Sequence, residues 1–263
     1  FRNSTLDAAP FSLNGQSVTK AADAQNRFGF SFRGPLRFPK WFGSDSTFFF
    51  INYSGSLVRN GTTLTGTVPT LAERQGDFSG SNTILYDPTT QLPIPGNRIS
   101  QVNSIAQGLL AYIPLPNQPG SVNNYRLVTT APNNNQSVNV RVNQTLSRRD
   151  QLSFGVNLQT RDSNNVQNYG FIDQSRGGGV NANVNYRHNF SARMFENLTV
   201  TFNRNTGTNN PFFENGADVA AALGIQGTSS NPLNFGPPNL NFTNFGALAD
   251  GSPSQTAVYS LGF

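Results

Sequence analysis

The chain has 263 residues, no cysteine and a formal net charge of +5 at neutral pH. Without cysteine, neither a disulfide framework nor a thiolate metal site can form. No apolar run approaches the about 18 residues that a transmembrane helix needs, so a helical membrane protein is excluded. The basic residues are dispersed along the chain rather than gathered in one segment. Because a nucleic-acid interface needs clustered basic residues, we expect no nucleic-acid partner.

The first part of the chain predicts short strands joined by polar or aromatic connections. Residues 1–26 suggest a partial strand followed by the polar stretch Asn14 to Ser17. Residues 27–34 alternate, with phenylalanine at every second position, and Pro35 ends this strand because proline cannot donate to a ladder. The link 36–46 contains Trp41 and two phenylalanines. These rings suit either a membrane–water interface or a small hydrophobic plug, and a further strand is predicted at 47–57.

Residues 60–135 form the longest stretch without alternation, and they contain eight prolines. One helical pattern is visible at 102–112, where Pro114 stops it. A connection of this length usually signals function or an elaborated surface. A second long polar stretch covers residues 206–255. It predicts a short helix at 218–223, ended by Gly224, and a short strand at 239–245.

The region from Ser137 to Asn205 alternates apolar and polar residues in four segments. A period of two places each set on one face of a strand, and each segment has roughly the 9–11 residues that a tilted strand needs to cross a bilayer. The connections are predicted to be short at 147–150, long at 162–178, short at 189–196 and long from 206. This order is typical of a bacterial outer-membrane barrel.

We therefore predict an all-β fold, an antiparallel up-and-down transmembrane β-barrel with long extracellular loops that carry short helices. Apolar faces would meet lipid, and the polar faces, rich in Asn, Ser, Thr and Arg, would line the lumen. Two alternatives remain open. A surface-attached β-sandwich used for adhesion would show the same alternation, with its apolar faces packed on one another. A passive porin would have the same strands without a plug.

A set of short motifs resembles the Oar-like TonB-dependent receptors of acidobacteria and related groups. The motifs occur in the expected order over nearly the whole chain, and it is the ordered set that is specific. They are Phe1-Arg2-Asn3-Ser4-Thr5-Leu6-Asp7-Ala8, Asn26-Arg27-Phe28-Gly29-Phe30, Gly34-Pro35-Leu36, Thr47-Phe48-Phe49-Phe50, Thr67-Val68-Pro69-Thr70, Gly76-Asp77-Phe78-Ser79, Tyr86-Asp87-Pro88, Pro95-Gly96-Asn97-Arg98-Ile99, Tyr112-Ile113-Pro114-Leu115-Pro116-Asn117 and Leu223-Gly224-Ile225.

The resemblance implies a larger protein with a signal peptide, a carboxypeptidase-regulatory-like domain, a plug and a barrel of usually about 22 strands. Residues 1–263 would then be the first part of the barrel, with the signal peptide, the regulatory-like domain and the plug outside it. Such a fragment would remain an open sheet when alone. The implied partners are outer-membrane lipid, an unknown extracellular ligand and the TonB complex, which would act through the missing plug.

The search for chemistry yields no catalytic, cofactor-binding or metal-ligating residues, and the ligand-binding residues are unknown. His188 is the only histidine, and its place beside a turn favours an interfacial role over a catalytic one. Glu73, Asp77 and Asp87 match no calcium loop and are expected to be solvated charges. Nothing assembles a nucleophile, a base and an oxyanion donor, so we expect no enzyme and no cofactor.

Overall fold

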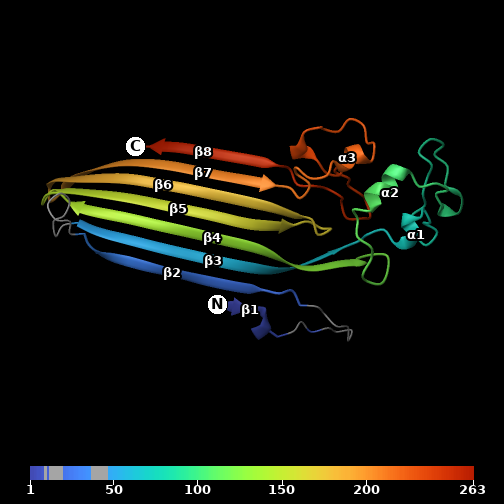
Figure 1. Ribbon diagram of the computed structural model, residues 1–263, viewed down its shortest axis with the longest axis horizontal. Coiled ribbons are helices and arrows are strands. Elements are labelled where there is room, and N and C mark those ends of the chain that lie inside the picture. The colour runs from blue at the N-terminus through green and yellow to red at the C-terminus, as the bar shows by residue number, and fades with distance from the viewer. Residues whose placement is uncertain (9–10, 12–19, 37–46) are drawn as a thin grey trace.

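The strands of this computed structural model, which describes residues 1–8, 11, 20–36 and 47–263, form one antiparallel sheet (Figure 1). Their order in the sheet is their order in the chain, so the up-and-down prediction is confirmed. The alternative of two packed sheets is wrong, because the described strands make one sheet. The strands are β1 (Arg2–Asn3), β2 (Ala24–Pro35), β3 (Thr47–Gly66), β4 (Tyr125–Thr145), β5 (Asp150–Val166), β6 (Ile172–Ser191), β7 (Met194–Asn210) and β8 (Ser254–Gly262).

The pairing register places apolar residues of neighbouring strands side by side. One row across the sheet contains Phe32, Ile51, Val140, Val156, Ala182, Phe202 and Leu261. The adjacent positions form rows of Asn, Ser and Thr on the other face, because successive side chains of a strand point to opposite faces. We call these the apolar face and the polar face. A slip of one residue in any strand would invert its contribution, so the pattern fixes the register.

Two strand connections are tight turns at one end of the sheet, at 146–149 and 192–193. At the other end, the connection predicted to be long at 162–178 is only 167–171, so that prediction is wrong. Strands β5 and β6 continue through polar residues as far as Val166 and Ile172, which pair with each other. Backbone pairing does not require apolar side chains, and for this reason alternation in hydropathy underestimated the strands.

The connections between β3 and β4 and between β7 and β8 are long, although shorter than predicted: 67–124 in place of 60–135, and 211–253 in place of 206–255. They carry the helices α1 (Leu71–Arg74), α2 (Ser104–Leu110) and α3 (Val219–Ala222) and the 3₁₀ turns Pro95–Asn97 and Pro232–Asn234. The last two helices confirm the helical predictions, and Gly224 follows α3 with a φ of 72°. The predicted strand at 239–245 is absent; only a single bridge joins Leu240 to Leu248. The polar stretch 14–17 and most of the aromatic link 36–46 lie outside the described residues.

The buried apolar core among the described residues lies in these connections rather than in the sheet. Val68 and Leu248 are fully buried and belong to different long connections. They pack together with Leu109 and Ile113, and with Tyr125 where β4 begins. Phe171 of the short connection 167–171 meets Phe213 edge to face, with ring centroids 4.8 Å apart. All three connections therefore form one folded unit, which we call the cap (Figure 1).

The sheet remains open. Within the described strands, β1 pairs only with β2 and β8 pairs only with β7. Many side chains of the apolar face are exposed; Phe32 is 64% exposed and Leu261 is 60% exposed. No helix of the described segments is long and apolar enough to span a membrane.

Candidate functional site

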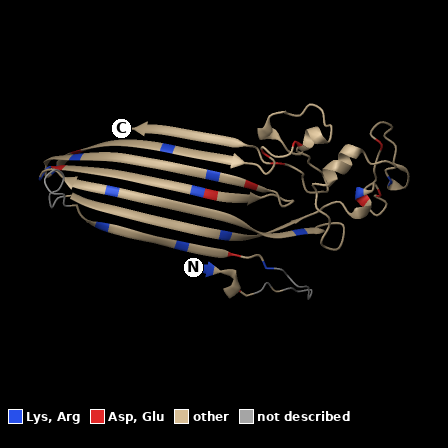
Figure 2. Cartoon of the chain, viewed as in Figure 1, with Lys and Arg blue, Asp and Glu red and all other residues tan. Residues whose placement is uncertain are grey.

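The polar face carries arginines between rows of small polar side chains. By the pairing register these are Arg27 and Arg33 on β2, Arg141 on β4, Arg161 on β5 and Arg187 on β6. Figure 2 shows that basic residues stand singly along the strands rather than in a cluster. Hydrogen bonds between neighbouring strands connect the amides, as from Asn157 to Ser137 at 3.1 Å and from Asn203 to Ser260 at 3.2 Å. The face is therefore hydrogen-bonding and positively charged.

A hollow of about 720 Å³ lies on this face near the middle of the sheet. Its lining includes both Arg27 and Arg161, and the Nε of Arg161 donates to Asn135 at 3.1 Å. The hollow is deep because several of the residues that line it are glycines without side chains, including Gly29 and Gly177. At Gly29 a Cβ would lie 2.6 Å from the carbonyl oxygen of Tyr53, so only glycine fits there. A polar ligand with negative charge suits this hollow best.

Arg74 holds the first long connection of the cap together. Its guanidinium donates to the carbonyl oxygens of Pro69 at 3.1 Å, Leu110 at 2.8 Å, Ile113 at 2.9 Å and Pro114 at 2.5 Å. The planar guanidinium with its five N–H donors suits this fork of acceptors. Burial lowers the pKa of Arg74, but the group stays charged. One side chain thus joins α1 to the end of α2.

Asn124 provides a second polar bond inside the cap. The side chain is fully buried, accepts from the backbone N–H of Val68 at 2.8 Å and donates to its carbonyl oxygen at 2.8 Å. A buried backbone group without a partner costs about 1–3 kcal/mol, and Asn124 satisfies both groups of Val68. The start and the end of the connection 67–124 are joined at this point.

The three loop carboxylates singled out from the sequence do not come together. Glu73 accepts from the backbone N–H of Thr70 in a capping box, and Asp77 pairs with Arg98 at 3.0 Å. Hydrogen bonds from Ser79 and from Arg98 lower the pKa of Asp77 to about 2. Backbone N–H groups of Thr90 and Thr89 lower the pKa of Asp87. These groups build turns, and no cluster of three metal-ligating side chains occurs among the described residues.

A pair of carboxylates, Asp173 and Asp250, lies where the cap meets β6. Gln167 donates through its amide nitrogen to Asp173 at 2.8 and 2.9 Å and to Asp250 at 3.3 Å. Asp173 is 3% exposed and also accepts from the backbone N–H of Phe212. Burial raises the pKa of Asp250, with Asp173 contributing in the same direction, against the hydrogen bonds that Asp250 accepts. The side-chain amide of Gln167 therefore bridges the two carboxylates of Asp173 and Asp250.

This arrangement predicts that the cap becomes more stable as the pH falls toward the ordinary pKa of an aspartate side chain. Because the folded-state pKa of Asp250 is raised, the folded state binds more protons, and stability declines as pH rises from the unfolded pKa to the folded one. We expect Asp250→Asn to slow proteolysis of residues 211–253 at pH 7. The advantage should vanish near pH 4. If Asp250→Asn and the unchanged protein were cut equally fast at pH 7, the prediction would be contradicted. Asp218→Asn, which removes a charge elsewhere in the same connection, serves as the control.

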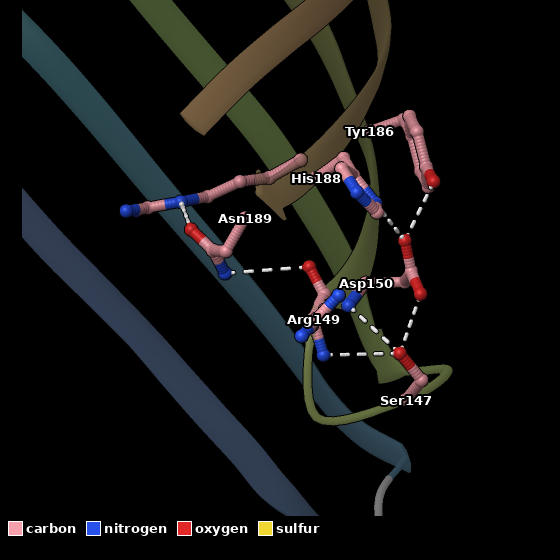
Figure 3. Close-up of polar contacts among 7 residues, drawn as sticks. Ser147, Arg149, Asp150, Tyr186, His188 and Asn189 are labelled. Atoms are coloured by element: carbon pink, nitrogen blue, oxygen red, sulfur yellow. Dashed lines mark hydrogen bonds and ion pairs between the residues drawn. The ribbon is translucent and has the colours of Figure 1, made fainter. Parts of the chain in front are cut away.

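A polar cluster fixes the tight turn between β4 and β5 to β6 (Figure 3). The carboxylate of Asp150 accepts from the hydroxyls of Tyr186, at 2.7 Å, and Ser147, and lies 2.6 Å from Nδ1 of His188. Ser147 in turn accepts from the backbone N–H of Arg149 at 3.0 Å. Since the serine contacts the carboxylate and not the imidazole, no activated nucleophile results. His188 lies at the turn end of the apolar face, where an interfacial residue is expected.

A single sheet with an apolar and a polar face, tight turns at one end and a cap at the other defines the wall of a transmembrane β-barrel. On β6 the apolar face runs from Val180 to Phe190, about 33 Å along the strand and about 25 Å high at the usual barrel tilt. The model of a family described as outer membrane beta barrel domain matches residues 1–260, and the chain belongs to this family. The protein is therefore a bacterial outer-membrane protein. No curated protein and no solved structure matches the chain.

Membership in this family identifies the apolar face as the lipid-facing surface, the polar face as the lumen wall and the cap as the extracellular end. Sequence reasoning found the strands and the two faces. It missed the Arg74 clamp, by which we mean the hydrogen bonds from Arg74 to four carbonyl oxygens. It also missed the buried Asn124 and the two carboxylates that Gln167 contacts. All of these contacts join residues far apart in loops, where the sequence shows no periodicity. Gly177 and Gly178 of β6 lie in the stretch 162–178, which the alternation had assigned to a long connection.

Proposed function

We propose that this chain forms part of the barrel of a TonB-dependent receptor of the Oar-like type, which binds a ligand at the cell surface and passes it across the outer membrane. The observation that carries the proposal is the combination of an open eight-stranded sheet with a folded cap. Eight strands suffice for the smallest barrels, yet here the edges do not meet. The wall therefore fits a wide barrel, which would be closed either by further strands or by further copies of this chain.

The strand lengths support a large receptor. Strands β3 to β7 have 17 to 21 residues, about twice the 9–11 that cross a bilayer. On β6 the apolar positions begin at Val180, so the excess length lies on the side of the cap, at the opposite end of the strands from the tight turns (Figure 1). The wall would therefore rise above the membrane before the cap begins. A tall wall under a folded cap surrounds a vestibule that suits ligand capture better than simple diffusion.

The polar face indicates the class of ligand. Five arginines line it, and Asp173 is the only carboxylate that the register places on this face in the described strands β2 to β8. Because Asp173 is buried against Gln167, it does not offset the positive field of the lumen wall. The proposed ligand is anionic or carries an anionic group. We propose binding and passage without catalysis, and no role for nucleic acid.

The main alternative is a passive porin, and two measurements on the complete protein separate the two functions. A TonB-dependent receptor has a plug, so in a planar lipid bilayer in KCl it should show no steady open conductance. It should also bind the purified periplasmic domain of TonB in surface plasmon resonance. Steady conductance together with no binding of TonB would overturn the proposal and establish a passive pore.

A further inference from the structure

A groove crosses the apolar face where its apolar rows end on the side of the cap. It has a volume of about 400 Å³, and its lower edge is formed by Tyr53, Val138, Leu158 and Val180. The register places the next row of that face, with Gln136, Thr160 and Thr206, at its upper edge. The groove exists because Gly178 carries no side chain. A Cβ there would point into it, 3.5 Å from the hydroxyl of Thr206.

Positive charge borders the same groove. Arg204 stands in the row of Val180 and lines the groove, and its guanidinium lies 5.6 Å from the ring centroid of Tyr259. In the described part of the chain no carboxylate is within ion-pair distance of Arg204. A smaller hollow of about 330 Å³ continues toward the cap, lined by Arg176 and Thr208. Arg176 is paired with Asp162 at 3.5 Å, and both side chains are mostly exposed.

The position of the groove on the sheet indicates what kind of molecule it binds. Apolar residues lie below it and polar hydroxyls and arginines above it, so it straddles the boundary between hydrocarbon and headgroups. Tyr53 and Tyr259 lie in the same row of the sheet, as expected for an aromatic girdle. An occupant must therefore carry an acyl chain and an anionic headgroup. Basic pockets between transmembrane helices bind such headgroups, and Arg204 offers the same chemistry here.

We propose that this groove binds an outer-leaflet lipid through its phosphorylated headgroup. The acyl chain packs on Val138, Leu158 and Val180. Arg204 pairs with the phosphate, and the hydroxyls of Thr160 and Thr206 donate to its oxygens. The backbone of Gly178 lets the headgroup approach the sheet closely. This site lies on the outside of the wall, so it depends on membrane location and not on the transport function proposed above.

The test uses the complete outer-membrane protein purified in detergent, with bisphosphorylated lipid A as the probe. Native mass spectrometry measures the retained lipid. We expect Arg204→Gln and Gly178→Val each to reduce retention about tenfold, the first by removing charge and the second by filling the groove. Arg98→Gln removes an equal charge from the cap and should leave retention unchanged. Dephosphorylated lipid A should be retained about tenfold less than the probe.

Two results would overturn the proposal. Retention by Arg204→Gln and Gly178→Val equal to that of Arg98→Gln would show that the groove does not hold the lipid. Equal retention of phosphorylated and dephosphorylated lipid would show that the headgroup is not recognised. The heat-modifiable migration of each variant in gels verifies that the barrel has folded, so a loss of retention can be assigned to the groove.

Discussion

Replacing Arg74 by alanine should open the first half of the cap while the sheet stays intact. The change removes the donors to four carbonyl oxygens, at Pro69, Leu110, Ile113 and Pro114. Hydrogen bonds from a charged donor contribute about 1.5–3 kcal/mol each, and water replaces part of this at a half-buried site. We expect the free energy of local opening to fall by about 3 kcal/mol, which corresponds to about 100-fold faster amide exchange in residues 67–124.

Hydrogen exchange of the outer-membrane protein in detergent, followed by mass spectrometry, measures this effect. Peptides from β4 to β6 serve as an internal reference and should not change. Arg74→Lys keeps the charge, but its ammonium cannot reach four carbonyls, so we expect an intermediate effect. Arg98→Ala removes a mostly exposed arginine whose ion pair contributes little, and should change exchange by less than about threefold. Equal amide exchange in the alanine variants of Arg74 and Arg98 would contradict the stabilising role assigned to Arg74.

The parts of the fold that could be predicted from the sequence are those that a repeating physical constraint produces. Lipid on one side and water on the other impose a period of two, and this period revealed Val138 to Leu146 and its neighbours as strands. The constraint ends where the wall leaves the membrane. There β5 and β6 continue through Asn164 and Gln174, which pair without any apolar residue beside them. Strand ends are therefore the least predictable feature of this wall.

The cap obeys a different constraint. Its core joins Val68, Leu109 and Leu248, which are distant in the chain, and no period connects them. Helix signals were readable because they are local: Pro114 after α2 and Gly224 after α3 end helices by backbone geometry. At Gly108 of α2 a Cβ would lie 2.2 Å from the side chain of Leu223, so the two long connections interlock at a glycine. Such a contact is invisible before both loops are placed.

The open sheet leads to the second large prediction, which concerns residues 1–263 produced alone. Both edges of the sheet present unpaired backbone groups, and in hydrocarbon each costs several kcal/mol. The apolar face adds exposed aromatic and aliphatic side chains such as Phe30 and Leu261, at 62% and 60% exposure. In water, exposed edges and an exposed apolar face both promote association between copies. We expect aggregates in buffer and open, mixed assemblies in detergent.

If this chain is part of a wider barrel, as proposed, the complete protein is the matched control, because closure of its barrel removes both edges while the sequence of residues 1–263 stays the same. It should migrate as one heat-modifiable band and sediment as one species in detergent. Residues 1–263 should show no heat-modifiable band and a broad distribution of sizes in analytical ultracentrifugation. The prediction would fail if residues 1–263 gave a monodisperse soluble monomer with one cooperative thermal transition. The cap and the turn at Asp150 would then stabilise the sheet without closure, and the requirement for a wider barrel would disappear.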